Sequence, residues 1–251
     1  MMPVVFTALG VGGATVIGAF LGFLFKNPSH KMNDVILSFA AGVMLASSVV
    51  GLVLPSLEYG GWWAILVTAF GVFAGAITLN LIDRLVPHLH KIAGDDGERH
   101  PKSSEKLNKV ILFVIAIAIH NFPEGVAAGV GFGTGDDMQA ISLAIGIALQ
   151  NIPEGMVIIA PMVASGISKR KAFLISAITG LIEVVGTFMG YFAASISEAI
   201  LPFALSFAGG TMLYVISDEM IPETHSHGAE RAATYSLLLG FLVMLAFDFL
   251  L

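Results

Sequence analysis

Two copies of one hexapeptide carry the residues best suited to chemistry in this chain. Residues 120–125 read His-Asn-Phe-Pro-Glu-Gly, and residues 150–155 read Gln-Asn-Ile-Pro-Glu-Gly. The copies share a polar residue, an asparagine, an apolar residue and then Pro-Glu-Gly, at a spacing of 30 residues. Both lie inside long apolar segments, where a carboxylate is costly by at least ~2.5 kcal/mol and therefore indicates a functional site.

Helical geometry predicts what each copy presents. Residues four apart share one face of a helix, so His120 projects beside Glu124 and Gln150 beside Glu154, with each asparagine on an adjoining edge. Each proline also leaves the carbonyl four residues earlier without its usual donor. Freed carbonyls at membrane depth are tolerated where they line a cavity, as in the broken helices of transporters.

A third acidic residue, Glu183, lies in the apolar segment Gly180–Gly186. Three buried carboxylates repel one another unless a cation joins them. One imidazole, several carboxylates and amide oxygens form a mixed nitrogen and oxygen set that suits Zn²⁺, Fe²⁺, Mn²⁺ or Cd²⁺ better than Na⁺ or K⁺. The predicted metal ligands from the residues themselves are His120, Asn121, Glu124, Gln150, Asn151, Glu154 and Glu183.

Each of these residues also has a purely structural interpretation. An intramembrane His, Asn or Gln often serves only as a hydrogen bond between helices. Met44 is, on the sequence alone, a flexible apolar gap-filler. Polar residues near the ends of the apolar segments are interpreted either as metal entrance or exit positions or as interfacial and solvated groups: Glu219, Glu223, His225, His227, Asp248, His88 and His90.

The elements that position these residues are predicted to be membrane-spanning helices. The 251 residues are 56% hydrophobic and only 12% charged, against about 25% charged in a soluble domain. A bilayer core of roughly 30 Å needs about 20 helical residues, and the apolar runs predict an all-α protein with eight spans. The continuous apolar character of these runs excludes barrel strands. The predicted spans are 3–25, 34–57, 62–82, 109–132, 138–165, 171–194, 199–221 and 232–251, in a single transport domain covering residues 1–251.

The positive charges predict the orientation. All 12 Lys and Arg residues lie in or beside the connections after spans one, three, five and seven. Since such residues stay on the cytoplasmic side, both termini are expected outside the cytoplasm, and the long connection 85–108 within it. The chain has no cysteine, which excludes thiolate ligands and disulfides.

The doubled hexapeptide resembles the signature of the ZIP (Zrt/Irt-like protein) metal transporters, particularly their bacterial members. The resemblance extends over the chain, through the eight spans and the Asp218–His225 end of span seven. It implies an inverted repeat relating the first three and last three helices around helices four and five, a 3+2+3 arrangement. It further implies a homodimer, and transport into the cytoplasm across a bacterial plasma (inner) membrane.

The resemblance also implies a two-metal centre. One site matches Met44, His120, Glu124, Gln150 and Glu154; the other matches Asn121, Glu124, Asn151, Glu154 and Glu183, with both motif glutamates bridging. Many members carry His where this chain has Gln150, which removes one nitrogen ligand. Zn²⁺, or Cd²⁺, Fe²⁺ or Mn²⁺, is then the transported substrate rather than a cofactor, and no enzyme activity or nucleic-acid partner is expected.

Two other functions use the same residues. An intramembrane metallohydrolase would also hold a metal between helices, but such sites usually have three strong ligands and a water, and only His120 of the seven histidines lies within a span. A proton or monovalent-cation channel could use the same carboxylates. Metal uptake into proteoliposomes separates these alternatives.

Overall fold

The computed structural model describes residues 1–24, 29–59, 61–85, 118–164, 166–196 and 199–250. All regular structure among them is helical. The helices are α1 (Met2–Gly22), α2 (His30–Ser48), η1 (Val49–Val53), α3 (Leu54–Tyr59), η2 (Gly61–Trp63), α4 (Ala64–Leu85), a helix over residues 118–130, η3 (Gly131–Thr134), α7 (Asp137–Ala164), α8 (Lys169–Ile196), α9 (Leu201–Val215), η4 (Ile216–Met220), α10 (Ile221–Thr224) and α11 (Glu230–Leu250).

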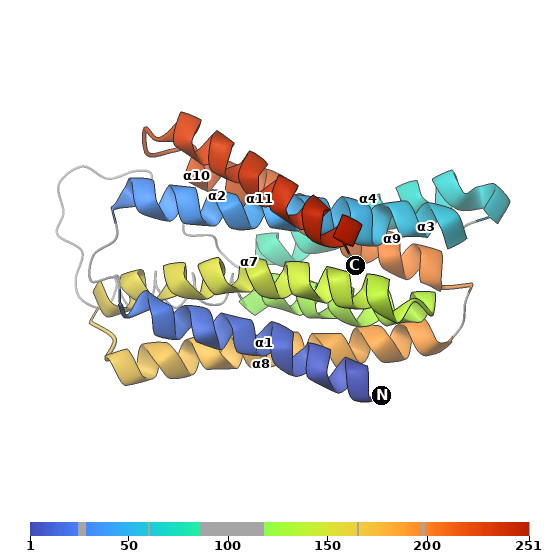
Figure 1. Cartoon of the computed structure of the whole chain (residues 1–251), viewed down its shortest axis with the longest axis horizontal. Coiled ribbons are helices and arrows are strands. Elements are labelled where there is room, and N and C mark those ends of the chain that lie inside the picture. The colour runs from blue at the N-terminus through green and yellow to red at the C-terminus, as the bar shows by residue number, and fades with distance from the viewer. Residues whose placement is uncertain (25–28, 60, 86–117, 165, 197–198, 251) are drawn as a thin grey trace.

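Seven continuous helical stretches are long and apolar enough to cross a membrane within the described part of the chain. They lie at 2–22, 30–59, 61–82, 137–160, 169–196, 201–224 and 230–250, close to seven of the predicted spans. The fourth predicted span, 109–132, is described only from residue 118, where it is helical. The prediction of an all-helical, multi-pass membrane protein is therefore confirmed. The N- and C-terminal ends lie on the same side of the bundle (Figure 1).

The outer faces of these helices are apolar because lipid, not water, surrounds them. Phe6 on α1, Phe70 on α4, Leu181 on α8 and Leu242 on α11 are all largely exposed. A continuous helix satisfies its own backbone hydrogen bonds in hydrocarbon, where no water can do so. Polar caps appear only at the ends: Asp136 Oδ1, for example, accepts hydrogen bonds from the backbone of the first turn of α7.

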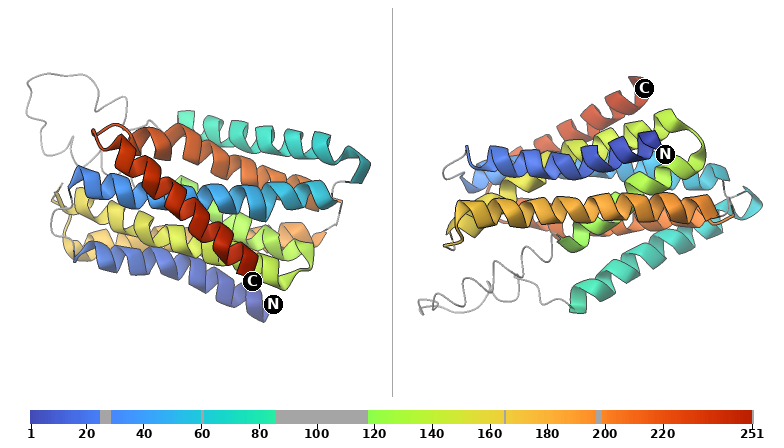
Figure 2. Two further views of the ribbon diagram at one scale, coloured as in Figure 1. Left: turned by 45° about the horizontal axis from the view of Figure 1, so that its top comes forward. Right: turned by 90° about the horizontal axis from the view of Figure 1, so that it is seen from below.

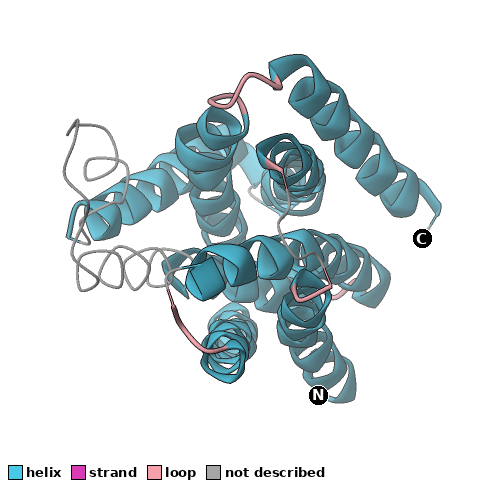
Figure 3. Cartoon of the chain, turned by 90° about the vertical axis from the view of Figure 1, so that its left-hand side faces the viewer, coloured by secondary structure: helices cyan, strands magenta, loops and turns pink. Residues whose placement is uncertain are grey.

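Glycines divide the described helices into two closely packed groups. α1 packs along α7 and α8, and the 118–130 helix also packs against α8; we call these four helices the motif bundle. In the second group, the frame bundle, α11 crosses α2 diagonally (Figure 2) and α4 packs along α9. Figure 3 views the molecule along its long axis, so that some helices are seen nearly end-on and others, such as the helix that ends at the C-terminus, run obliquely. Within each bundle, glycine lets one backbone touch another: a Cβ at Gly42 would lie 1.9 Å from the carbonyl oxygen of Leu237.

Two π-helical turns interrupt the frame bundle. The turn η1 lies between α2 and α3, and η4 lies between α9 and α10. Each is followed at the second position by a proline, Pro55 or Pro222. The α-helix continues past the motif prolines Pro123 and Pro153, and the π-helical turns of the described chain lie instead in spans two and seven. π-helical turns are frequent at functional sites.

Candidate metal site

Glu183 of α8 is the centre of the most fully bonded group in the interior of the motif bundle. Its side chain is completely buried. Oε1 accepts hydrogen bonds from Asn121 Nδ2 and from Thr15 Oγ1, the latter at 2.6 Å. Oε2 accepts a hydrogen bond from Asn151 Nδ2 at 2.5 Å. Three helices therefore donate to one carboxyl group, which fixes it between them.

The two motif asparagines consequently use their nitrogen atoms on Glu183 and keep their oxygens free. Asn121 Oδ1 and Asn151 Oδ1 are both buried without a hydrogen-bond partner. Buried polar atoms are nearly always paired, so two orphaned acceptors on equivalent motif positions require an explanation. Amide oxygens are ligands for hard and borderline divalent cations, and a bound cation would satisfy both.

The next motif positions also have buried polar atoms without partners. Both carboxylate oxygens of Glu124 and both amide atoms of Gln150 are buried without a hydrogen bond of normal geometry, although Gln150 lies close enough to interact with Glu124. Burying a carboxylate without a hydrogen-bond partner costs more free energy than burying a neutral polar group, because its charge is also removed from water. Among the unpaired atoms of Asn121, Glu124, Gln150 and Asn151, the oxygens outnumber the one nitrogen, Nε2 of Gln150. Such an excess of acceptors is the chemistry expected of a cation site.

Charge repulsion points to the same conclusion. If ionised, Glu124 would be repelled by Glu154 and by Glu183, and Glu183 by Glu154, so the three carboxyl groups lie within electrostatic range of one another. A protonated His120 would in turn attract Glu154. Glu124 is 1% exposed and Glu183 is fully buried, whereas Glu154 is only partly buried. The repulsion among these buried groups would be relieved by a divalent cation.

His120 also reaches across to the frame bundle. Its Nε2 lies 2.9 Å from Glu219 Oε1, which belongs to the π-helical turn η4. This contact places Glu219, predicted only as an entrance or exit position, directly beside the first motif. Met44 of α2 is completely buried and belongs to a large apolar cluster that also contains Ile147, as the gap-filling interpretation expects.

These groups do not form a finished metal cage in this conformation. Within the part of the chain that the structure describes, no three His, Asp or Glu side chains converge closely enough to hold an ion between them. The donors lie instead as neighbouring sets: Glu183 with the asparagines, Glu124 with Gln150, and His120 with Glu219. The predicted ligands are thus gathered in one interior region, and their direct coordination of a metal stays a prediction.

The remaining predicted positions lie toward the two ends of the helices. Asp248, on the last turn of α11, accepts a hydrogen bond from Ser142 Oγ at 3.2 Å. At the opposite end, His225 bonds to Ile221 O and to Thr234 Oγ1, so it joins α10 to α11. Its neighbour His227 pairs with the buried Asp34 at 3.0 Å.

The last predicted positions are Glu223 and two histidines of the long connection. Glu223 of α10 is half-buried at the same end of the frame bundle as His225. His88 and His90 lie outside the described residues. The histidines after span seven therefore have structural hydrogen bonds in this conformation, and metal binding by them stays a prediction.

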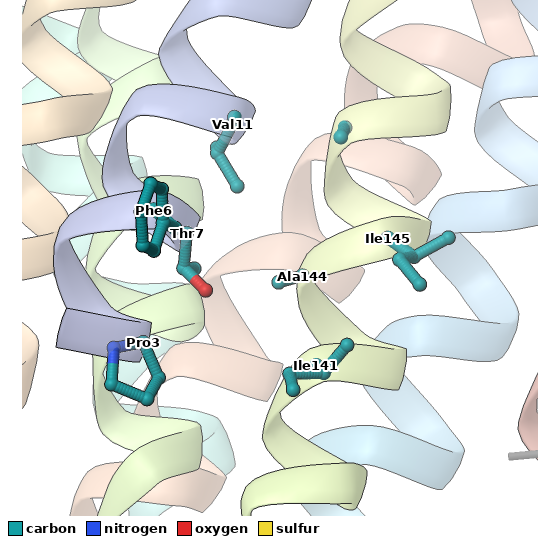
Figure 4. Close-up of a pocket in the computed structure, with 9 residues that line it drawn as sticks. Pro3, Phe6, Thr7, Val11, Ile141, Ala144 and Ile145 are labelled. Atoms are coloured by element: carbon teal, nitrogen blue, oxygen red, sulfur yellow. The ribbon is translucent and has the colours of Figure 1, made fainter.

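A cavity of about 380 Å³ lies between α1 and α7. Figure 4 shows the lining residues of α1 on one side and those of α7 on the other, with Thr7 and Ala144 directed into the space between them. Its wall is apolar except for Thr7, so it offers no set of metal donors. The lining residue Val11 nevertheless connects it to the site, because the carbonyl oxygen of Val11 accepts a hydrogen bond from Asn151 Nδ2 at 3.3 Å.

Two polar residues that the motifs did not identify belong to these networks. Thr15 donates to Glu183, and Asp34 pairs with His227. A signal for Thr15 exists in the sequence: it lies three residues from Gly12 and from Gly18, and Glu183 lies three residues from Gly180 and from Gly186. Asp34 stands in the first turns of a span and carries no comparable pattern.

Comparison with known proteins identifies the family. The model of the ZIP Zinc transporter family matches residues 87–248. Similar proteins include zinc transporter GufA of Myxococcus xanthus, 40% identical over 96% of this chain and 96% of its own. Zinc transporter ZIPB of Bordetella bronchiseptica is 36% identical over 94% of this chain and 77% of its own, and zinc transporter ZupT of Chlorobaculum parvum is 37% identical over 93% and 91%. The doubled motif, the membrane helices and these similarities agree, and the chain belongs to the ZIP family of metal-ion transporters.

Proposed function

We propose that this protein carries zinc, and with lower preference Cd²⁺, Fe²⁺ or Mn²⁺, across the membrane through the interior of the motif bundle. The supporting observation is the excess of buried acceptors over donors around Glu124, Asn121 and Asn151. The family and the zinc transporters that the chain resembles favour zinc as the substrate. Import into the cytoplasm, a bacterial plasma membrane location and a homodimer are proposals from the family resemblance.

The proposed site holds two ions. One ion would be bound by His120, Glu124, Gln150 and Glu154, with Met44 as the softest donor. The second would be bound by the oxygens of Asn121 and Asn151 together with the two motif glutamates and Glu183. Glu124 and Glu154 then bridge the ions, which would relieve the repulsion between them. For Glu183, ligation requires exchange of a present hydrogen bond for a metal contact.

The proposed route runs along the junction of the two bundles. Asp248 and Ser142 mark its outer end, and the contact between His120 and Glu219 marks the passage toward the cytoplasm. An ion that leaves His120 would meet the Glu219 carboxylate next, because the two side chains are already in contact. His225 and His227 could take part only after leaving their present partners.

Alternating access would come from movement of one bundle relative to the other. Inside each bundle, glycines bring backbones into contact, and such packing does not slide easily. Between the bundles, contacts are made by side chains: the space beside Gly146 of α7 is filled by Ser47 of α2 and Met244 of α11. Side-chain contacts can exchange without disrupting a helix, so this junction is the proposed sliding surface.

Uptake of radioactive zinc into proteoliposomes tests the proposal. Wild-type protein should accumulate zinc, and Glu124→Ala or Glu154→Ala should reduce the rate at least tenfold. The matched control is Glu58→Ala, which removes an exposed glutamate at the end of α3. Protons or Na⁺ passing through the wild-type protein without zinc would instead favour the channel alternative, and zinc uptake by the two motif variants at the wild-type rate would refute the site.

A further inference from the structure

Thr15 of α1 makes a contact that its position in an apolar helix does not require. The side chain is 1% exposed, and its hydroxyl donates to Glu183 Oε1 at 2.6 Å across the helix interface. A buried threonine in a helix usually donates to the carbonyl three or four residues earlier. Thr187 does so, with its hydroxyl 2.9 Å from the backbone oxygen of Glu183. Thr15 instead directs its hydrogen bond to the carboxylate of another helix.

The carbonyl that the Thr15 hydroxyl does not use accepts a hydrogen bond from another side chain. That carbonyl belongs to Val11, four residues earlier, and it accepts the hydrogen bond from Asn151 Nδ2. The same amide nitrogen also donates to Glu183 Oε2. Thr15, Asn151 and Glu183 therefore connect α1, α7 and α8 in one closed network, and loss of the Thr15 hydroxyl would release one side of it.

Glycines bring these helices close enough for the network to form. Gly12 and Gly180 face each other, and a Cβ on either would lie 2.3 or 2.4 Å from the carbonyl oxygen of the other. Gly155 of the second motif packs against the backbone of Thr15 itself, where a Cβ would lie 2.3 Å from the carbonyl oxygen. The position of Thr15 is thus fixed from both sides, and its short side chain can reach Glu183.

We propose that Thr15 is a positioning residue for the transported ion. Its hydroxyl holds Oε1 of Glu183, so that the carboxylate takes the amide nitrogens of Asn121 and Asn151 and leaves their oxygens for the cation. The inference rests on the proposed function, since it assigns a role in the same site. The inference adds Thr15 of α1 to the proposed metal site as a residue that orients a ligand without binding the ion.

Three variants test this role in zinc uptake by proteoliposomes. Thr15→Val keeps the shape and removes the donor, Thr15→Ser keeps the donor, and Thr187→Val makes the same change at a buried threonine bonded only to backbone. Losing the buried hydrogen bond to Glu183 is expected to raise the KM for zinc about tenfold in Thr15→Val, with the maximal rate within about threefold of wild type. Thr15→Ser and Thr187→Val should stay within about twofold in both parameters.

The outcomes separate this inference from the proposed function. If Thr15→Val does not reach the membrane, Thr15→Ala replaces it with the same expected rise in KM and the same rescue by Thr15→Ser. The positioning role would be overturned if Thr15→Val or Thr15→Ala had the same KM as Thr187→Val, or if Thr15→Ser did not restore the wild-type KM. In that case Glu124→Ala would still be inactive, and the proposed function would stand. Failure of wild-type protein to transport zinc would overturn the proposed function, and this inference with it.

Discussion

At the scale of single residues, the site is defined by which atoms lack partners. Glu183 satisfies the asparagine nitrogens, and the asparagine oxygens and the Glu124 carboxylate stay unsatisfied. A cation bound in the proposed site would satisfy these acceptors. In that site Gln150 would set part of the selectivity, because its amide offers oxygen where imidazole would offer nitrogen.

Gln150→His is therefore expected to change metal preference. Imidazole suits zinc, whereas carbonyl oxygen suits manganese. The variant should show a severalfold increase in the ratio of zinc to manganese uptake, measured by competition in proteoliposomes. Gln139→His is the matched control, because Gln139 lies in the first turn of the same helix, α7, away from the motif. An unchanged or lower ratio in Gln150→His would mean that Gln150 does not contact the ion.

At the scale of elements, the final glycine of each hexapeptide has a packing role. A Cβ at Gly125 would lie 2.2 Å from the carbonyl oxygen of Glu183, and one at Gly155 would lie 2.3 Å from that of Thr15. Each motif thus supplies candidate ligands. Its glycine also lets a neighbouring helix approach closely: α8 with Glu183 beside the first motif, and α1 with Thr15 beside the second. This explains why Pro-Glu-Gly recurs as a unit.

Gly125→Ala and Gly155→Ala should each destabilise the protein by about 1–3 kcal/mol or more, because backbone atoms must move to admit the methyl group. Thermal unfolding in detergent measures this as a lowered Tm. Gly10→Ala and Gly13→Ala are controls on α1, since a Cβ at either meets nothing within 4 Å. Their Tm should be unchanged or slightly raised. A Tm in the motif variants equal to that of these controls would contradict the packing argument.

The elements themselves could largely be predicted from the sequence. The boundaries of the helices agree with the predicted spans because hydrophobic length alone decides what crosses a bilayer. The π-helical turns could not be predicted, because a π-helical turn depends on how neighbouring helices pack. The contact of Glu219 with His120 and the role of Thr15 also depend on packing between segments distant in sequence. The motifs therefore predict the candidate ligands, whereas the hydrogen-bond partners of these ligands come from other segments and cannot be predicted from the motifs.

At the scale of the whole molecule, we propose that the first three spans and the last three are related by an inverted repeat. Contacts of α1 support this proposal: Gly18 approaches the backbone of Ile152, and Gly186 of α8 approaches that of Phe122, at the same position of the other motif. In the same way, Gly22 of α1 approaches the backbone of Met156 and Gly190 of α8 approaches that of Val126, and both of these residues directly follow the glycine of a motif. In Figure 1, α1 and α8 run in opposite directions.

The frame bundle supports the same relation. Gly42 of α2 approaches Leu237 of α11, and Gly210 of α9 approaches Val72 of α4. The second span of each repeat, which begins with α2 in one and with α9 in the other, contains a π-helical turn followed by proline. These turns are η1 and η4. Under this relation Thr15 and Glu183 are equivalent positions, so the two residues joined by the hydrogen bond of 2.6 Å lie on the axis of the repeat.

Movement between the bundles can be tested with introduced disulfides, because the chain has no cysteine of its own. Ser142→Cys with Asp248→Cys would join α7 to α11 across the junction, where the present side chains are 3.2 Å apart. Oxidation should abolish zinc uptake, and reduction should restore it. Ser56→Cys with Thr68→Cys joins two helices of the frame bundle, at hydroxyls 2.8 Å apart, and should transport zinc in both states. Uptake by the oxidised 142–248 pair at the reduced rate would contradict movement at this junction.

The central claim is that an ion binds among the carboxylates of spans four, five and six, and anomalous X-ray diffraction from zinc-loaded crystals tests it most directly. The account predicts zinc density within about 2.0–2.2 Å of oxygen atoms of Glu124 and Glu154, absent in crystals of Glu124→Ala. Zinc density confined to the ends of the helices, with none between these two glutamates at saturating zinc, would contradict it.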